Sequence, residues 1–191
     1  MRAALGVLVL LCVGCGAARP LPPRIAPLPE LPFALAEGPR ALRTAWSRAE
    51  ALLSEHAPVP PARGFDSVED AARWADARLM PFAHDFLDRM TSVTDPLAGA
   101  VALDPSLRVF AASIAALLYE HLLNGLTLPT PHELEDDPEL VAAFRDAFVD
   151  ATAFAADETR ALLSACVEYA GGRADATAWG EDCAQRLARA R

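Results

Sequence analysis

Hydrophobic residues follow one another without a charge from position 109 to 119, in the segment VFAASIAALLY, with Ser113 as its single small polar residue. This run is too short for a membrane span, which needs about 20 apolar residues. Because it is apolar on every side, we expect a helix that the rest of the chain covers on all faces. The pattern predicts an all-α fold, a single bundle of about five helices around a central apolar helix at residues 105–124. Asp104 and Asn124-Gly125 are its expected start and stop signals.

Apolar positions three, four and seven residues apart predict the other helices. Residues 39–56 form the expected first helix, and residues 67–90 form the second, with Ser67 as its N-cap. Pro81 lies inside the second pattern and is expected to kink or split the helix, because proline removes one backbone donor. Asp95-Pro96 has the form of a new helix start, so residues 94–103 are predicted to be a loop.

A long helix is predicted after an acidic loop, from Asp137-Pro138 to the stop at Gly171-Gly172. It would have about 33 residues, far more than the usual 11 or 12, so a break near Ala156-Asp157 is one interpretation. Glu158 falls on the expected core stripe, so either the helix breaks there or the stripe drifts and leaves the carboxylate exposed. This stripe is expected to run through Val141, Phe144, Phe148, Ala151, Ala155, Leu162, Ala165 and Tyr169.

A last helix is predicted to run from about residue 175 or 177 to 190, with Trp179, Cys183 and Leu187 facing inward. Together with the long helix it forms a C-terminal helical hairpin. Cys166 and Cys183 would then face each other across the antiparallel pair. In an oxidising compartment two such cysteines usually form a disulfide, although two buried free thiols are the alternative.

The N-terminus has the pattern of an export signal, in which Arg2 precedes an apolar run from Ala3 to Val13. The run leads into LCVGCG at residues 11–16, which resembles the lipobox of bacterial lipoproteins. In that family a small residue precedes a cysteine that is acylated and becomes the new N-terminus. Cys12 stands where the family usually has leucine, and the resemblance extends no further into the chain.

The resemblance implies removal of residues 1–14 and a lipid anchor on Cys15. Gly16, in place of an aspartate, indicates the outer membrane by similarity to lipoproteins of two-membrane bacteria, with the domain facing the periplasm. Cleavage after Ala18, which would give a secreted or periplasmic soluble protein, is the alternative. Six prolines between residues 17 and 36 exclude regular helix or sheet. Residues 15–36 are therefore expected to be a lipidated, proline-rich tether, either a stalk or a ligand for an aromatic groove, and residues 37–191 the helical domain.

The net charge of the chain argues against two classes of partner, nucleic acids and anionic lipid surfaces. The formal charge is −9, and the 17 side-chain cations other than histidine are all arginine. Nucleic-acid binding needs a clustered basic surface, and the sequence shows none. An acidic surface also disfavours adsorption to anionic lipid, so membrane attachment is expected to come from acylated Cys15.

Candidate chemistry is sparse. His84 and Asp88 are four residues apart on a predicted helix, and Glu120-His121 ends the central helix, so these four are weak metal-site candidates. Their spacing differs from the Glu-x-x-His motif of carboxylate-bridged metal bundles, and we predict no metal and no cofactor. The acidic residues between 133 and 139 lack the alternating ligands and glycine of a calcium loop, and the helix dipole explains them sufficiently.

No local motif of nucleophilic catalysis or phosphate binding is present in the sequence, although triads also assemble from distant residues. The sequence therefore predicts an exported, lipid-anchored, non-catalytic binding or scaffold protein of the bacterial cell envelope, with a protein partner. A small-ligand or metal-binding helical domain is the second hypothesis, and an enzyme with a site assembled from distant residues is the third.

Overall fold

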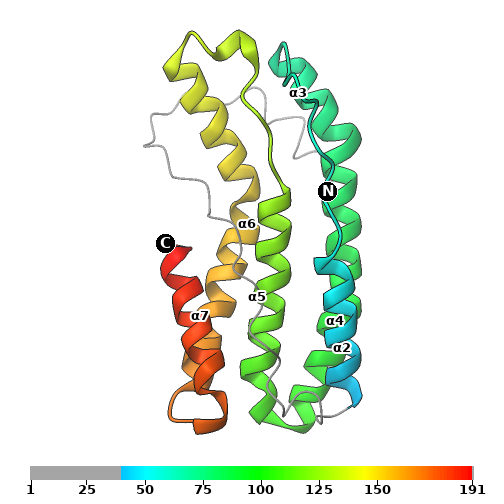
Figure 1. The fold of residues 1–191 in the computed structure, drawn as a ribbon, viewed down its shortest axis with the longest axis vertical. Helices are drawn as coiled ribbons and strands as arrows, with labels where there is room; N and C mark the ends of the chain where they lie inside the picture. The colour runs from blue at the N-terminus through cyan, green and yellow to red at the C-terminus, as the bar shows by residue number, and fades with distance from the viewer. Residues whose placement is uncertain (1–39, 191) are drawn as a thin grey trace.

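The computed structural model describes residues 40–190, apart from the side chain of Ala41 (Figure 1). The predicted signal segment, the acylated Cys15 and the tether lie outside the described residues. Within the described part of the chain every regular element is helical, which confirms the predicted all-α bundle. The main helices are α2 (Arg40–Leu53), α3 (Val68–Trp74), α4 (Met80–Leu103), α5 (Arg108–Gly125), α6 (Pro138–Ala170) and α7 (Thr177–Arg189).

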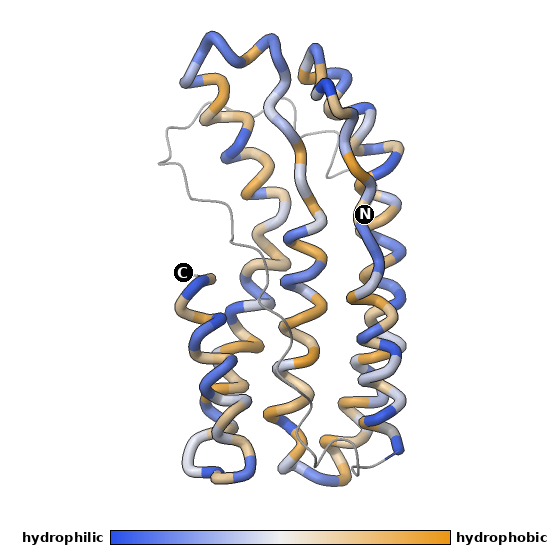
Figure 2. Tube along the Cα trace, in the orientation of Figure 1, coloured by the Kyte–Doolittle hydropathy of each residue, from blue (hydrophilic) through white to orange (hydrophobic). Residues whose placement is uncertain are grey.

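Helix α5 is the centre of the bundle, as its uniform apolarity predicts. Ile114 and Leu118 are both fully buried, and buried side chains occur on every side of the helix. The helical stretch Pro105–Gly125 is long and apolar enough to cross a membrane by length and composition, but more than half of its residues are buried inside the protein. Burial among neighbouring helices therefore accounts for its composition. Figure 2 shows hydrophobic positions along α5 and along the helices around it, while the turns at the top of the bundle are largely hydrophilic.

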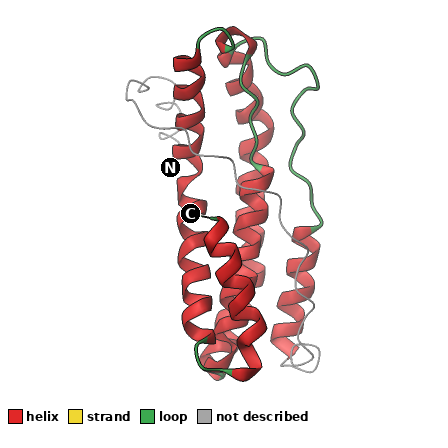
Figure 3. Ribbon diagram, turned by 60° about the vertical axis from the view of Figure 1, so that its left-hand side comes forward, coloured by secondary structure: helices red, strands yellow, loops and turns green. Residues whose placement is uncertain are grey.

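Two helix pairs flank α5. Helix α2 packs on α4 at one edge of the bundle, and α7 packs on α6 at the opposite edge, with α5 between them (Figures 1 and 3). Helix α2 buries Leu42, Ala45 and Ala49 in this packing, as its amphipathic pattern predicts. Phe110 of α5 and Trp179 of α7 meet edge to face with ring centroids 5.2 Å apart, which joins the hairpin to the central helix.

The second helix is longer than predicted, and the prediction of a loop at residues 94–103 is wrong. Helix α4 continues through Pro96 to Leu103. A proline in a helix leaves the carbonyl four residues earlier without its amide donor. Here that carbonyl belongs to Ser92, and Arg48 of α2 donates a hydrogen bond to it at 2.7 Å. A tertiary contact thus replaces the lost backbone bond, so the helix does not end.

Pro81 is accommodated in a different way. The five residues Ala75–Leu79 form a π-helical turn (η1) that joins α3 to α4 and ends two residues before Pro81. A π-turn widens the helix by one residue and is a known response to an interruption of the i to i−4 ladder. The predicted irregularity is therefore present, as a local bulge and not as a chain break. The predicted N-cap is also confirmed, since Ser67 Oγ accepts a hydrogen bond from the Asp70 amide at 3.1 Å.

Helix α6 is continuous over 33 residues, so the chain has no break near Ala156-Asp157. In the second half of α6 the buried stripe is shifted by one position along the sequence relative to the predicted stripe. Leu163, Cys166 and Ala170 are buried there, while Tyr169 is 38% exposed. A straight helix drifts by about 20° per heptad from a strict seven-residue repeat. Over the four heptads from Val141 to Tyr169 the drift is about 80°, close to the ~100° between adjacent residues.

The same drift explains the position of two polar residues. Glu158 is exposed, which is one of the two outcomes expected for it, and Thr159 is buried in its place. Thr159 Oγ1 donates to the Ala155 carbonyl at 2.7 Å, so the buried hydroxyl is satisfied within its own helix. The predicted cap residues work as expected at other helix ends. Asp104 accepts from the Ser106 amide at 2.9 Å, and Asp137 accepts from the Glu139 and Leu140 amides.

Candidate functional site

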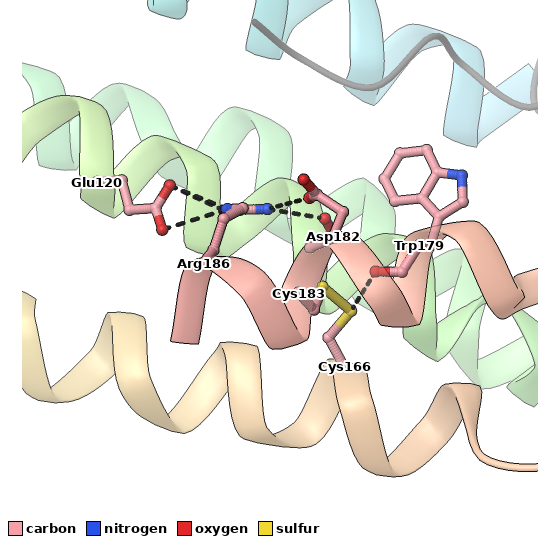
Figure 4. The surroundings of a disulfide bond; sticks show 7 residues. Glu120, Cys166, Trp179, Asp182, Cys183 and Arg186 are labelled. Atoms are coloured by element: carbon pink, nitrogen blue, oxygen red, sulfur yellow. Dashed lines mark hydrogen bonds and ion pairs between the residues drawn. A yellow bond between two sulfur atoms is a disulfide. The ribbon is translucent and has the colours of Figure 1, made fainter. Parts of the chain in front are cut away.

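The disulfide predicted between Cys166 and Cys183 is present (Figure 4). The Cα atoms are 6.2 Å apart, and both residues are fully buried between α6 and α7. The bond therefore fixes the register of the C-terminal hairpin, and no solvent reaches either sulfur. A buried, solvent-excluded disulfide is typical of a structural role and not of thiol exchange.

A buried charged cluster lies beside the disulfide, at the junction of α5 and α7 (Figure 4). Arg186 of α7 is only 5% exposed and points toward Glu120 of α5. Its Nε lies 3.1 and 3.2 Å from the two carboxylate oxygens of Glu120, and its Nη2 lies 3.0 Å from Oε2. Its Nη1 donates to Asp182 at 3.1 Å and to Ser113 Oγ at 3.2 Å.

This cluster explains why a hydroxyl interrupts the apolar central helix. Ser113 is fully buried, and burial of its hydroxyl without a hydrogen-bond partner would destabilise the fold. Arg186 satisfies it and is itself neutralised by Glu120 and Asp182. Breaking such a buried pair from one side typically costs about 3–5 kcal/mol, because an uncompensated charge remains. We therefore assign the cluster to the attachment of α7 to α5. The sequence signal for it was the spacing of Trp179, Cys183 and Arg186, which places the arginine on the inward stripe.

The four weak metal candidates do not come together. Glu120 pairs with Arg186, while the adjacent His121 points to the other side of α5, where its Nε2 donates to the Glu55 carbonyl at 2.8 Å and its ring stacks on Phe86 at 5.6 Å. His84 and Asp88 are exposed on α4. Within residues 40–190 no three His, Cys, Asp or Glu side chains are grouped closely enough to hold a metal ion.

A second charged cluster joins the end of α2 to α4. Both guanidinium Nη atoms of Arg89 contact the two carboxylate oxygens of Glu55, and Arg89 also lies 2.8 Å from Asp85. The hydrogen bond from Arg89 lowers the pKa of Glu55 below its ordinary value, although burial opposes this shift. Arg89 thus pairs with Asp85 four residues earlier on its own helix and, in a bidentate contact, with Glu55 from a distant part of the chain.

The acidic loop before α6 is organised by structural contacts. Glu133 accepts from the Val68 amide at 2.6 Å, at the start of α3. His132 bridges two loops, with Nε2 2.7 Å from the Arg63 carbonyl and Nδ1 2.8 Å from Glu135. Both ring nitrogens therefore face oxygen acceptors, and only the protonated ring can donate to both. The Arg63 carbonyl is the largest cause of a raised pKa at His132, followed by the Glu135 carboxylate.

The N-terminal half of α6 presents an apolar surface that the helical bundle leaves partly uncovered. No side chain between Pro138 and Phe154 is buried, whereas five residues in the second half are. Helix α7 runs along only the second half of α6 (Figure 1). Figure 2 shows hydrophobic positions recurring along the uncovered half. Leu140 and Phe154 are 49% and 48% exposed, and Val141, Phe144 and Phe148 on the adjoining side of the helix are partly buried. We call these five residues the α6 apolar surface.

Comparison of the chain with known protein families, with curated proteins and with solved structures finds no match.

Proposed function

We propose that the protein is an exported, lipid-anchored and non-catalytic component of the bacterial cell envelope, which binds a protein partner through the α6 apolar surface. The anchor follows from the LCVGCG segment at residues 11–16 and its resemblance to a lipobox. The binding role follows from the exposure of Leu140 and Phe154. Apolar patches left open on a folded domain commonly mark protein–protein contact sites.

The geometry of the hairpin favours a helical partner. Helix α7 ends at Arg189, only six residues beyond the disulfide at Cys183, and so covers α6 back to about residue 160. A helix from a partner would pack along the uncovered first half of α6, with its apolar face against Leu140 and Phe154, which lie on one side of that helix. Recognition of one helix by an apolar groove is a common binding mode. The buried charges elsewhere in the bundle are matched by structural partners, which supports a binding role over a catalytic one.

Site-specific crosslinking in intact cells tests the binding surface. A photo-crosslinking residue placed at Leu140 or Phe154 should yield one discrete adduct after irradiation. The same residue at Ala77, which is exposed on the opposite edge of the bundle, is the matched control. A helical domain in the partner, and loss of the adduct when Phe148 is replaced by glutamate, would support the proposal. Equal adduct patterns at Leu140 and Ala77 would contradict it.

The anchor is tested separately by intact-mass analysis of the protein from membranes. The proposal requires loss of residues 1–14 and an added mass that corresponds to acyl chains on Cys15. A mature chain that begins after Ala18, with no acyl mass, would replace the lipoprotein assignment with a soluble periplasmic one and would leave the binding surface on α6 unaffected.

A further inference from the structure

The outer face of α2 carries a stripe of cationic and hydroxyl side chains. Positions three, four, seven and eight residues apart share one face of a helix, and all the stripe residues are exposed. They line a shallow, open hollow on the surface of the domain. We call this group the α2 stripe; it consists of Arg40, Arg43, Thr44, Ser47 and Arg48.

The α2 stripe differs in charge from the rest of the domain. Helix α2 holds three arginines and one acidic residue, Glu50, a net charge of +2. Residues 54–190 contain ten arginines against 23 acidic residues, a net charge of −13. The domain is therefore polarised, because α2 carries a net positive charge on one edge while the remainder carries a large net negative charge. Helix α2 lies at the edge opposite to α6 and α7 (Figures 1 and 3).

The side chains of the stripe suit phosphate oxygens. Guanidinium groups donate paired hydrogen bonds to phosphate, and serine and threonine hydroxyls commonly add to such contacts. One Nη of Arg48 donates a hydrogen bond to the Ser92 carbonyl, and this bond positions the guanidinium on the helix surface. From Arg40 to Arg48 the stripe is about 12 Å long, at a rise of about 1.5 Å per residue. That length is enough to contact more than one lipid headgroup.

The position of the stripe along the chain identifies the phosphate source. Arg40 is the first residue of α2 and the first residue that the structure describes, so the stripe begins next to the predicted tether in the sequence. We propose that the α2 stripe binds the phosphate groups of anionic lipids in the membrane that holds the protein. This inference rests on the lipid anchor of the proposed function. The acidic remainder of the domain is repelled by the same surface, so α2 turns toward the lipid and the α6 apolar surface turns away from it.

The tether allows this contact without enforcing it. The 24 residues between Cys15 and Arg40 span at most about 75 Å as polyproline II. A domain confined within that distance experiences a high effective concentration of lipid headgroups, so a weak contact is sufficient. Each arginine near an anionic membrane changes the binding equilibrium by a factor of about five, and the effect decays within the Debye length. The contact is therefore strong at low salt and weak at high salt.

Chemical labelling of arginine in the membrane-bound protein tests the proposal. The acylated full chain is inserted into vesicles of phosphatidylcholine alone, or of phosphatidylcholine with one-third phosphatidylglycerol. Phenylglyoxal then modifies accessible guanidinium groups, and peptide mass spectrometry gives a rate for each arginine. Exposed arginines away from α2 serve as internal controls on the same molecule; these are Arg78, Arg145 and Arg189.

The expected result is a labelling rate at Arg40, Arg43 and Arg48 that falls about fivefold or more with anionic lipid, and that recovers in high salt. The control arginines should change by less than twofold. Equal rates in both vesicles, or equal protection of all six arginines, would overturn the proposal. Equal protection by inorganic phosphate in neutral vesicles would also overturn it, because the stripe would then be a soluble-anion site. The intact mass of the same sample shows independently whether the acyl chains are present. A chain without acyl groups and an acylated chain whose α2 stripe does not bind anionic lipid therefore give different results.

Discussion

Removal of the disulfide should destabilise the domain by an amount that follows from chain length. Cys166 and Cys183 are 17 residues apart, and in the chain-entropy model a crosslink across a loop of this length contributes about 3 kcal/mol to the free energy of unfolding. For a domain of roughly 150 residues this corresponds to a fall in Tm of about 6–12 °C. Both sulfurs are fully buried, so reductant should act mainly on the unfolded chain.

The assay is urea denaturation of the wild-type protein with and without a phosphine reductant, followed by far-ultraviolet circular dichroism. The C166A/C183A variant, measured in the same conditions, separates the crosslink from the loss of buried sulfur, because it should resemble the reduced wild type to within about 1 kcal/mol. An unfolding free energy that changes by less than about 1 kcal/mol on reduction would refute the reasoning. It would mean that the unfolded chain already holds the hairpin together, or that α7 contributes little to the cooperative unit.

Two further predictions concern backbone approach and pH. Gly180 lies against α6, and a Cβ added there would come within 2.5 Å of the Ala170 Cβ, so Gly180→Ala should destabilise the domain by about 1–3 kcal/mol. Gly99→Ala is the matched control: it meets no atom within 4 Å, and in the interior of α4 it should stabilise by about 0.5–1 kcal/mol, both as measured by urea denaturation. The raised pKa of His132 means that its protonated form is favoured in the folded state. Its contribution is fully present below the unfolded pKa of about 6.5 and is lost as pH rises through the folded pKa. The stability difference between wild type and His132→Gln, measured from pH 6 to 9, should therefore shrink toward high pH; a difference that grows with pH would contradict the assignment.

The periodicity of apolar residues was sufficient to predict most of the helices. The uniform apolarity of residues 109–119 identified the central helix, because only burial on all sides accommodates such a segment in a water-soluble fold. The pairing of Cys166 with Cys183 followed from the same periodicity, since both cysteines lie at similar distances from the hairpin turn. These features depend on residues close together in the sequence, where helix geometry alone fixes which side chains share a face.

The candidate site residues were harder to predict, because each depends on contacts between distant elements. The Ser92 carbonyl freed by Pro96 is satisfied by Arg48, 44 residues away, and no local rule reveals that donor. Ser113 and Arg186 are 73 residues apart, and only the packing of α7 against α5 brings them together.

By itself, the sequence determined most of the helical segments, with residues 94–103 as the exception, together with the central helix and the pairing of the cysteines, since these follow from helix geometry over short separations. Only the tertiary structure decided the rest. The drift of a straight α6 away from a heptad repeat selected Leu163 over Leu162 for the core. The first half of α6 extends beyond α7, and Leu140 and Phe154 stay exposed there, while the placement of α2 put a net positive charge at the opposite edge. The physical reason is that burial and charge distribution depend on which neighbours a helix acquires, and a local pattern does not specify those neighbours.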